Sequence, residues 1–144
     1  MPSTSYTVIG NFTATTLTFG SNNPSYGSVM AYSIQGNVTT NYVSGSPVEP
    51  GKIIHMNAIP RDSDHVFVNW TDGNGNVLST SDDYSFTMPS SSYTITANFS
   101  QKYTLNFSSS DSSYGAVSAY YVQGSTSTYI MSGASVEAGK TIHL

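Results

Sequence analysis

The sequence contains no cysteine and few charged residues, and each absence excludes a class of protein or site. Without cysteine, a disulfide framework and a thiolate metal or catalytic site are both excluded. Lys and Arg together number 4 against 8 Asp and Glu, which gives a formal net charge of -4. A chain with so few basic residues lacks the surface that neutralises phosphates, so we expect no nucleic-acid partner.

Long apolar stretches are also missing. A membrane-spanning helix needs about 18 to 20 consecutive apolar residues, and no segment of this sequence approaches that length. The first residues, MPSTSYTVIG, contain no basic region followed by an apolar run, so they do not resemble a signal peptide. We expect no membrane insertion by this segment, and for an exported protein we expect the signal segment to lie outside this piece.

The composition is instead rich in residues that favour strands. Serine and threonine number 26 and 17, and there are 11 tyrosines; Thr and Tyr both suit the pleated, half-buried surface of a sheet. Residues 93–100 read YTITANFS, which places Tyr, Ile, Ala and Phe on one face and polar residues on the other. Residues 103–107 and 83–88 alternate in the same way, and no segment has a sustained helical period. The sequence therefore predicts an all-β, mostly antiparallel fold with no substantial helix.

An internal repeat organises the chain. Residues 15–56 align with residues 103–144 at a constant shift of 88 residues, with 21 identities in 42 positions and no gap. A shorter match joins YTVIGNFT at 6–13 to YTITANFS at 93–100. Similarity at a fixed spacing is the signature of a repeat architecture, so we expect a tandem array of small β modules.

The two matches predict three segments. Residues 1–14 would be the last strand of a preceding repeat, residues 15–100 a complete module, and residues 101–144 the first half of a following repeat. That half unit has no counterparts of four aromatic residues: Phe67, Trp70, Phe86 and Phe99. Alone it would leave an unpaired sheet edge and an uncovered apolar face. We therefore expect its second half to come from another chain or molecule, or the sequence to be an excerpt from a longer polymer.

Residues 27–100 carry an ordered series of motifs that resembles one known family. The motif residues are Gly27, Val29, Gly51, Ile54, Met56, Ala58, Pro60, Phe67, Trp70, Tyr84, Phe86, Met88, Tyr93, Ile95, Ala97 and Phe99. Their order and spacing are similar to those of the divergent internalin-type B repeat. One departure is a 15-residue segment, AYSIQGNVTTNYVSG, which recurs as AYYVQGSTSTYIMSG. We interpret this segment as an added hairpin around residues 35–40.

The resemblance implies both architecture and role. It implies small modules of β-grasp-like or β-sandwich type, strung in tandem on secreted or surface-anchored microbial proteins. The core positions that we expect are Ile54, Met56, Phe67, Trp70, Phe86, Tyr93 and Phe99. The family has no catalytic residues to transfer, and the sequence has no G-x-S-x-G turn. We therefore expect an extracellular or cell-surface protein that is not an enzyme.

A calcium loop is one candidate site. The spacing of positions 1, 3, 5 and 12 of an EF-hand loop occurs at Asp72, Asn74, Asn76 and Asp83. Position 6 of that loop requires glycine but is Val77 here, and the last ligand is Asp where the motif has Glu. The residues DGNG between two strand-like segments are instead typical of a hairpin turn. The metal alternative is a Ca²⁺ ion shared by Asp62, Asp64 and Asp72; otherwise we expect no cofactor.

The added hairpin is a candidate contact surface because it is rich in aromatic residues. Its tyrosines and their repeat neighbours are Tyr32, Tyr42, Tyr120, Tyr121 and Tyr129. Asn37 lies at its expected tip within an N-x-T sequon and is the candidate glycan acceptor. His55 and His143 share one repeat position, opposite in phase to Ile54, so we expect them on the outer face of a strand.

Together these features predict a structural repeat that forms a stalk, sheath or fibre through module–module and strand-exchange contacts. Its partners would be copies of itself or neighbouring repeats, since a surface with little charge loses little hydration on packing. The alternative is an adhesin or carbohydrate-binding module that binds surface glycans through the Tyr-rich hairpin.

The turn interpretation of residues 72–76 predicts indifference to calcium. A ligand that binds only the folded state raises the melting temperature. Since the turn interpretation includes no bound Ca²⁺, we expect the same melting temperature in excess Ca²⁺ and in chelator. Differential scanning calorimetry under the two conditions measures this. A higher melting temperature in Ca²⁺ would favour the Asp62, Asp64 and Asp72 site instead.

Overall fold

The structure is a computed structural model that describes residues 14–144, so the strand predicted within residues 1–14 lies outside the described part. The strands are β1 (Thr15–Ser21), β2 (Gly27–Gln35), β3 (Val38–Tyr42), β4 (Ser46–Val48), β5 (Ile53–Pro60), β6 (His65–Asp72), β7 (Val77–Ser79), β8 (Asp83–Thr87), β9 (Tyr93–Leu105), β10 (Ala119–Gln123), β11 (Thr126–Ile130), β12 (Ala134–Glu137) and β13 (Ile142–His143). Residues 14–144 contain no helix, and hence none that could cross a membrane. The predicted all-β, mostly antiparallel fold is confirmed.

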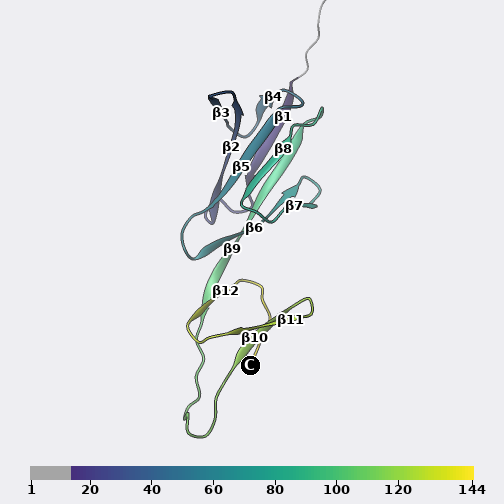
Figure 1. Ribbon diagram of the computed structural model, residues 1–144. Coiled ribbons are helices and arrows are strands. Elements are labelled where there is room, and N and C mark those ends of the chain that lie inside the picture. The colour runs from purple at the N-terminus through teal and green to yellow at the C-terminus, as the bar shows by residue number, and fades with distance from the viewer. Residues whose placement is uncertain (1–13) are drawn as a thin grey trace, which may run out of the picture.

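The first unit is a sandwich of two sheets (Figure 1). One sheet has the order β4-β1-β9-β6-β7 and the other has the order β3-β2-β5-β8. Side chains from both sheets meet in one buried cluster, which includes Leu17 and Ile95 from the first sheet and Ala31 and Met56 from the second. Of the two architectures implied by the resemblance, the sandwich is therefore the one observed.

Trp70 lies at the centre of this cluster and is fully buried. Its ring packs 5.3 Å from Phe67, and its indole N–H donates to the backbone oxygen of Ser81 at 2.8 Å, so the polar end of the side chain is satisfied. The other expected core residues lie around it. Ile54, Met56 and Phe99 are buried, while Phe67, Phe86 and Tyr93 are partly buried and pack against the cluster.

The first and last strands of the unit are neighbours. Residues Leu17 to Ser21 of β1 pair in parallel with residues Tyr93 to Ala97 of β9, and β6 pairs antiparallel with residues Ile95 to Gln101 along the other edge of β9. The strict alternation in β9 turns Ile95, Ala97 and Phe99 into the core. This parallel pair places β1 and β9 side by side within the sheet, with β4 on the other side of β1.

Strand β9 runs across the predicted boundary between residues 100 and 101. It continues from Ser100 to Leu105 and there pairs with β12 (Figure 1). The pair Leu105 and Ala134 reproduces the pair Leu17 and Ser46 of the first unit, 88 residues earlier. One strand therefore closes the first unit and opens the second.

The second unit repeats the pairing of the first wherever the corresponding strands are present. Tyr120 lies opposite His143 as Tyr32 lies opposite His55, and β10 and β11 form the same hairpin as β2 and β3. The hairpin tips contain glycines with φ of 60° in the first unit and 62° in the second, a conformation that side chains disfavour. The added segment is thus a hairpin in both units, as predicted.

A glycine contact at the sheet edge gives a stability test. A Cβ atom on Gly27 would lie 2.5 Å from the Phe99 ring and 2.8 Å from the backbone oxygen of Ile59, whereas a Cβ on Gly20 or Gly115 meets nothing within 4 Å. We expect Gly27→Ala to destabilise the first unit by about 1–3 kcal/mol, the usual cost of overpacking. Chemical denaturation followed by the fluorescence of Trp70 measures this, with Gly20→Ala as the matched control. Equal unfolding midpoints for the two variants would contradict the packing described.

Candidate functional site

The candidate calcium loop is, as the turn interpretation predicts, a closed turn between β6 and β7. One carboxylate oxygen of Asp72 accepts hydrogen bonds from the backbone N–H groups of Asn74 and Asn76, both at 2.9 Å, and the other accepts from the Asn76 side chain at 2.9 Å. Gly75 has φ of 85°, and its N–H donates to the backbone oxygen of Asp72 at 3.1 Å. Both carboxylate oxygens of Asp72 therefore accept hydrogen bonds from within the turn itself.

The carboxylate of Asp62 also has local partners. Asp62 accepts a hydrogen bond from the backbone N–H of Asp64 at 3.0 Å and lies 2.6 Å from Nδ1 of His65. The contact with the His65 side chain is the main cause that lowers the pKa of the Asp62 carboxyl below its usual range. Within residues 14–144 no group of three or more His, Asp or Glu side chains is arranged to hold a metal ion. The structure therefore does not bring Asp62, Asp64 and Asp72 together as a site.

The two histidines at the shared repeat position stack on tyrosines. The His55 ring lies 5.2 Å from the Tyr32 ring with an interplanar angle of 21°, and the His143 ring lies 4.9 Å from the Tyr120 ring with an angle of 16°. Nδ1 of His55 also lies 2.8 Å from the hydroxyl of Ser85. Since neighbouring side chains in β5 point to opposite faces and Ile54 is buried, these stacks lie on the outer face of their sheets.

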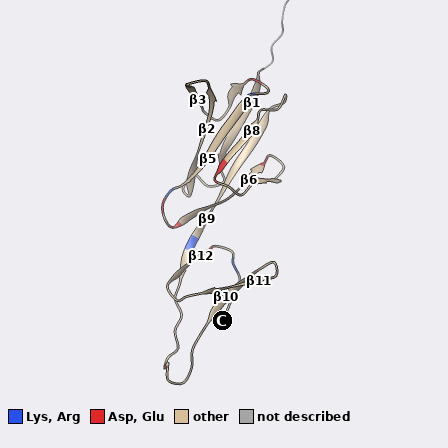
Figure 2. Ribbon diagram, viewed as in Figure 1, with Lys and Arg blue, Asp and Glu red and all other residues tan. Residues whose placement is uncertain are grey.

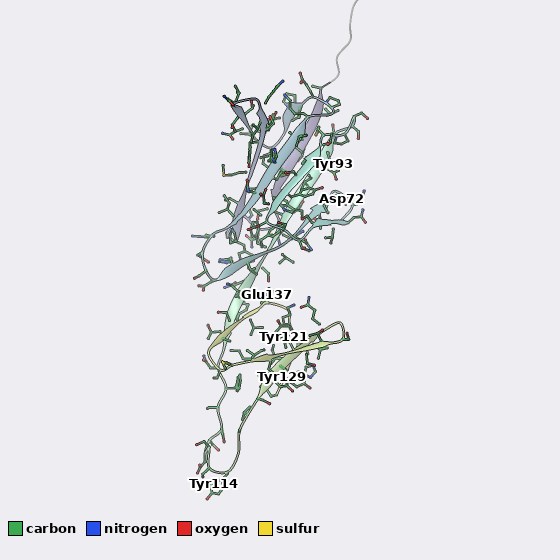
Figure 3. The ribbon with its side chains drawn as sticks, in the orientation of Figure 1. Asp72, Tyr93, Tyr114, Tyr121, Tyr129 and Glu137 are labelled. Carbon is green, nitrogen blue, oxygen red and sulfur yellow. The ribbon has the colours of Figure 1, made fainter. Side chains whose placement is uncertain are left out.

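The structure divides the five tyrosines of the candidate contact surface between two faces. Tyr32 and Tyr120 lie outward with the histidines, and Tyr129, 72% exposed, lies beside Tyr120. Tyr42 turns inward instead, because it pairs with the buried Ala31, and its hydroxyl lies 2.9 Å from that of Ser33. Tyr121 takes the repeat position of the inward Ser33, and the Lys140 ammonium lies 5.2 Å from its ring. Figure 3 shows Tyr121 and Tyr129 in the second unit.

Asn37, the candidate glycan acceptor, occupies the tip between β2 and β3 and is exposed. Its neighbour Gly36 carries the positive φ of this turn. The side chain therefore stands clear of both sheets, where a modifying enzyme could reach it.

Sequence reasoning missed an apolar outer face on the four-stranded sheet. Besides Tyr32 and His55, its outward positions carry four exposed aliphatic residues: Met30, Ile34, Ile53 and Ile59. Charged residues are sparse over the whole ribbon in Figure 2. The signal was partly available in residues 53–60, where the outward phase carries Ile53 and Ile59 beside His55 and Asn57.

The Asp72 turn yields a pH prediction. Hydrogen bonding by the Asn76 side chain is the main cause that lowers the pKa of the Asp72 carboxyl. Because the folded pKa is depressed, the stabilisation is present above the unfolded pKa of about 3.9 and is lost as the pH falls through the folded pKa. We expect the carboxyl ¹³C resonance of Asp72 to titrate below pH 3.9, and Asn76→Ala to move its midpoint upward. A midpoint that Asn76→Ala leaves unchanged would contradict this assignment.

Comparison with known proteins gives one match. The model of the family described as divergent InlB B-repeat domain matches residues 26–103, which is more than half of the chain. Searches of curated proteins and of solved structures found no match to this chain. The family match covers the motif series from Gly27 to Phe99 and confirms the resemblance drawn from the sequence. The chain belongs to the divergent InlB B-repeat family.

Proposed function

We propose that this chain is a structural repeat of an extracellular surface protein, which extends as a stalk, sheath or fibre with its units joined through β9. B-repeat domains are typical of surface and secreted proteins and are generally non-catalytic, which supports a mechanical role and not an enzymatic one. The observation that carries the proposal is the passage of β9 from one unit into the next without a loop.

Backbone hydrogen bonds connect β9 to both units at the boundary between them. The N–H of Lys102 donates to the backbone oxygen of Asp64 in the first unit at 2.7 Å, and the N–H of Ala138 in the second unit donates to the oxygen of Gln101 at 2.7 Å. Pairing with β6 reaches Gln101, and pairing with β12 begins at Lys102. With no flexible residues between the two pairings, the strand transmits the direction of one unit to the next, as an extended repeat array requires.

The outer surface supports packing against copies of the chain. The apolar outer face of β2 and β5 is rimmed by few charges, so its burial against another molecule would release water from apolar area at little electrostatic cost. Ile53, for example, is 57% exposed at the start of β5. Lateral association of stalks or fibres would cover it.

A second candidate is glycan binding by an adhesin. The exposure of Tyr129 beside Tyr120 favours it, since exposed aromatic rings form platforms for sugar faces. The split of the tyrosines between two faces weighs against a single binding surface. On a glycan array, binding that is lost in Tyr129→Ala would favour the adhesin over the structural repeat.

The structural proposal is tested by assembly. We expect electron microscopy and light scattering of the purified chain to show ordered fibres or large particles with a regular repeat. Lys102→Pro removes the N–H that bonds Asp64 and interrupts β9, so it should abolish the regular repeat. Lys102→Ala keeps that N–H and should assemble as the unmodified chain does. A well-folded monomer at all concentrations would contradict the proposal.

A further inference from the structure

Strand β3 forms one edge of the four-stranded sheet and, within residues 14–144, pairs only with β2 (Figure 1). An edge strand presents unpaired backbone N–H and C=O groups, which another strand can bind. Proteins usually protect such edges with charged residues, with proline, with a bulge or by keeping the strand very short. Among the edge strands of the first unit, β3 is the one that carries none of these protections.

The other three edge strands of the first unit are protected in different ways. Strand β4 has only three residues, and one of them is Pro47. Strand β7 also has three residues, and its register with β6 is irregular. Strand β8 begins at Asp83, directly after Asp82. In contrast, β3 has five residues, VTTNY, with neither charge nor proline, and residues 14–48 contain no charged side chain at all.

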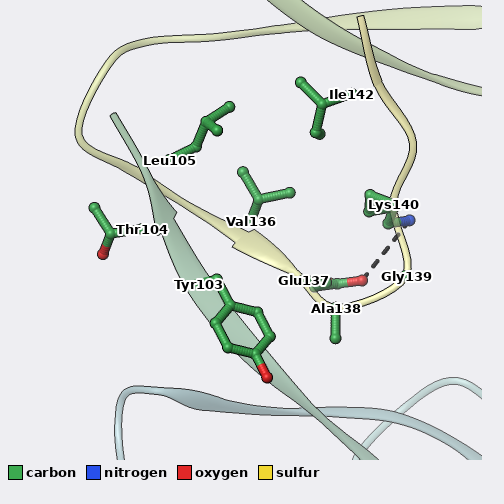
Figure 4. A pocket seen from close by; sticks show the side chains of 9 residues that line it. All are labelled: Tyr103, Thr104, Leu105, Val136, Glu137, Ala138, Gly139, Lys140 and Ile142. Carbon is green, nitrogen blue, oxygen red and sulfur yellow. Dashed lines mark ion pairs between the residues drawn. The ribbon is translucent and has the colours of Figure 1, made fainter. Parts of the chain in front are cut away.

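The same contrast occurs in the second unit. Strand β11, the counterpart of β3, reads TSTYI and has neither charge nor proline. Strand β12, the counterpart of β4, instead ends at Glu137, whose carboxylate lies 3.7 Å from the Lys140 ammonium (Figure 4). The unprotected edge is therefore a property of the added hairpin in both units.

The register of the hairpin determines which backbone groups of β3 are free. Gln35 pairs with Val38 across a two-residue turn. In such a hairpin the pair beside the turn exchanges hydrogen bonds, and so does every second pair beyond it. The backbone groups of Val38 and Thr40 therefore face β2, while those of Thr39 and Asn41 point away from the sheet. Thr39 and Asn41 are both exposed.

We propose that β3 is the edge through which two copies of the chain associate, by antiparallel pairing of their β3 strands about a two-fold axis. The axis passes between the two Thr40 residues. Thr39 of each copy then exchanges both backbone hydrogen bonds with Asn41 of the other copy, and the two four-stranded sheets become one continuous sheet. The inference rests on the proposed function, because it names the surface through which repeat arrays associate laterally.

Three features make a second copy the occupant that fits this edge. The free backbone groups are placed symmetrically about Thr40, as a two-fold axis requires. The edge carries no charge, so identical strands meet without repulsion. Val38, which is 65% exposed, comes to lie opposite Tyr42 of the other copy, and aromatic residues pair favourably with β-branched ones. Ile34, 54% exposed on the neighbouring strand, joins the apolar outer faces of the two copies.

Single cysteines can report this register, because the chain has none of its own. Across the two-fold axis the Cα atoms of the two Thr40 residues would lie about 4.5 Å apart, as in a pair without hydrogen bonds, and a disulfide can bridge them. The two Thr39 residues, like the two Asn41 residues, would lie on a diagonal of about 7–8 Å, beyond the usual reach of a disulfide.

We expect Thr40→Cys to form disulfide-linked dimers at least tenfold faster than Thr39→Cys or Asn41→Cys. Glutathione disulfide serves as the oxidant, and non-reducing electrophoresis measures the rate. All three residues are exposed, so random collision would link the three variants at the same rate.

Charge at the axis gives a second test. Thr40→Asp places two carboxylates opposite each other and should weaken self-association at least tenfold in sedimentation velocity at low salt. Because Thr40 is exposed, this variant should keep the thermal unfolding of the unmodified chain. Thr40→Ser is the matched neutral control. An equimolar mixture of Thr40→Asp and Thr40→Lys chains should associate again, since opposite charges then meet at the axis.

Equal cross-linking of the three cysteine variants would overturn the proposal, and so would self-association that Thr40→Asp leaves unchanged. A chain that stays monomeric would leave the edge to a strand of another protein and also contradict the proposal. Ordered fibres with equal cross-linking at the three positions would remove this edge and leave the structural function standing. Dimers linked at Thr40 in a chain that forms no regular particle would do the reverse.

Discussion

The hydrogen bonding of β9 is the constraint on which the rest of the structure depends. Over residues Tyr93 to Leu105 this strand pairs with β1, β6 and β12, and its inward residues also supply part of the core. Because a buried N–H or C=O group without a partner costs free energy, an interruption of β9 would leave three strands short of partners. The sheet, the core and the junction between units therefore all depend on an intact β9.

Much of the fold is predictable because it follows from local patterns. Alternation in residues 93–100 determines which side chains face inward, and the gap-free repeat predicts the shared registers of the two hairpins. The partners of β9 are not predictable in this way, since alternation assigns a face to each side chain and not a neighbour to the strand. The polar residue Gln101 takes a position of the apolar phase and so conceals the continuation of the strand across the boundary.

The candidate sites likewise divide into those that local sequence predicts and those that depend on strand pairing. The DGNG turn follows from residue types alone, since Asp and Gly have specific roles in tight turns. The tyrosines required the register of the hairpin: with Gln35 opposite Val38, Tyr32 faces Asn41, and Tyr42 falls on the other face with Ala31.

The most direct test of the shared strand is amide hydrogen exchange along β9. If one strand closes the first unit and opens the second, protection must continue from Phe99 through the Lys102 amide, which bonds Asp64, and must fall only after Leu105. Residues 108 and 109 lie outside any strand and serve as the internal reference. Protection that ends at Ser100, with residues 101–105 exchanging as fast as residues 108 and 109, would show two units joined by a linker and contradict the account.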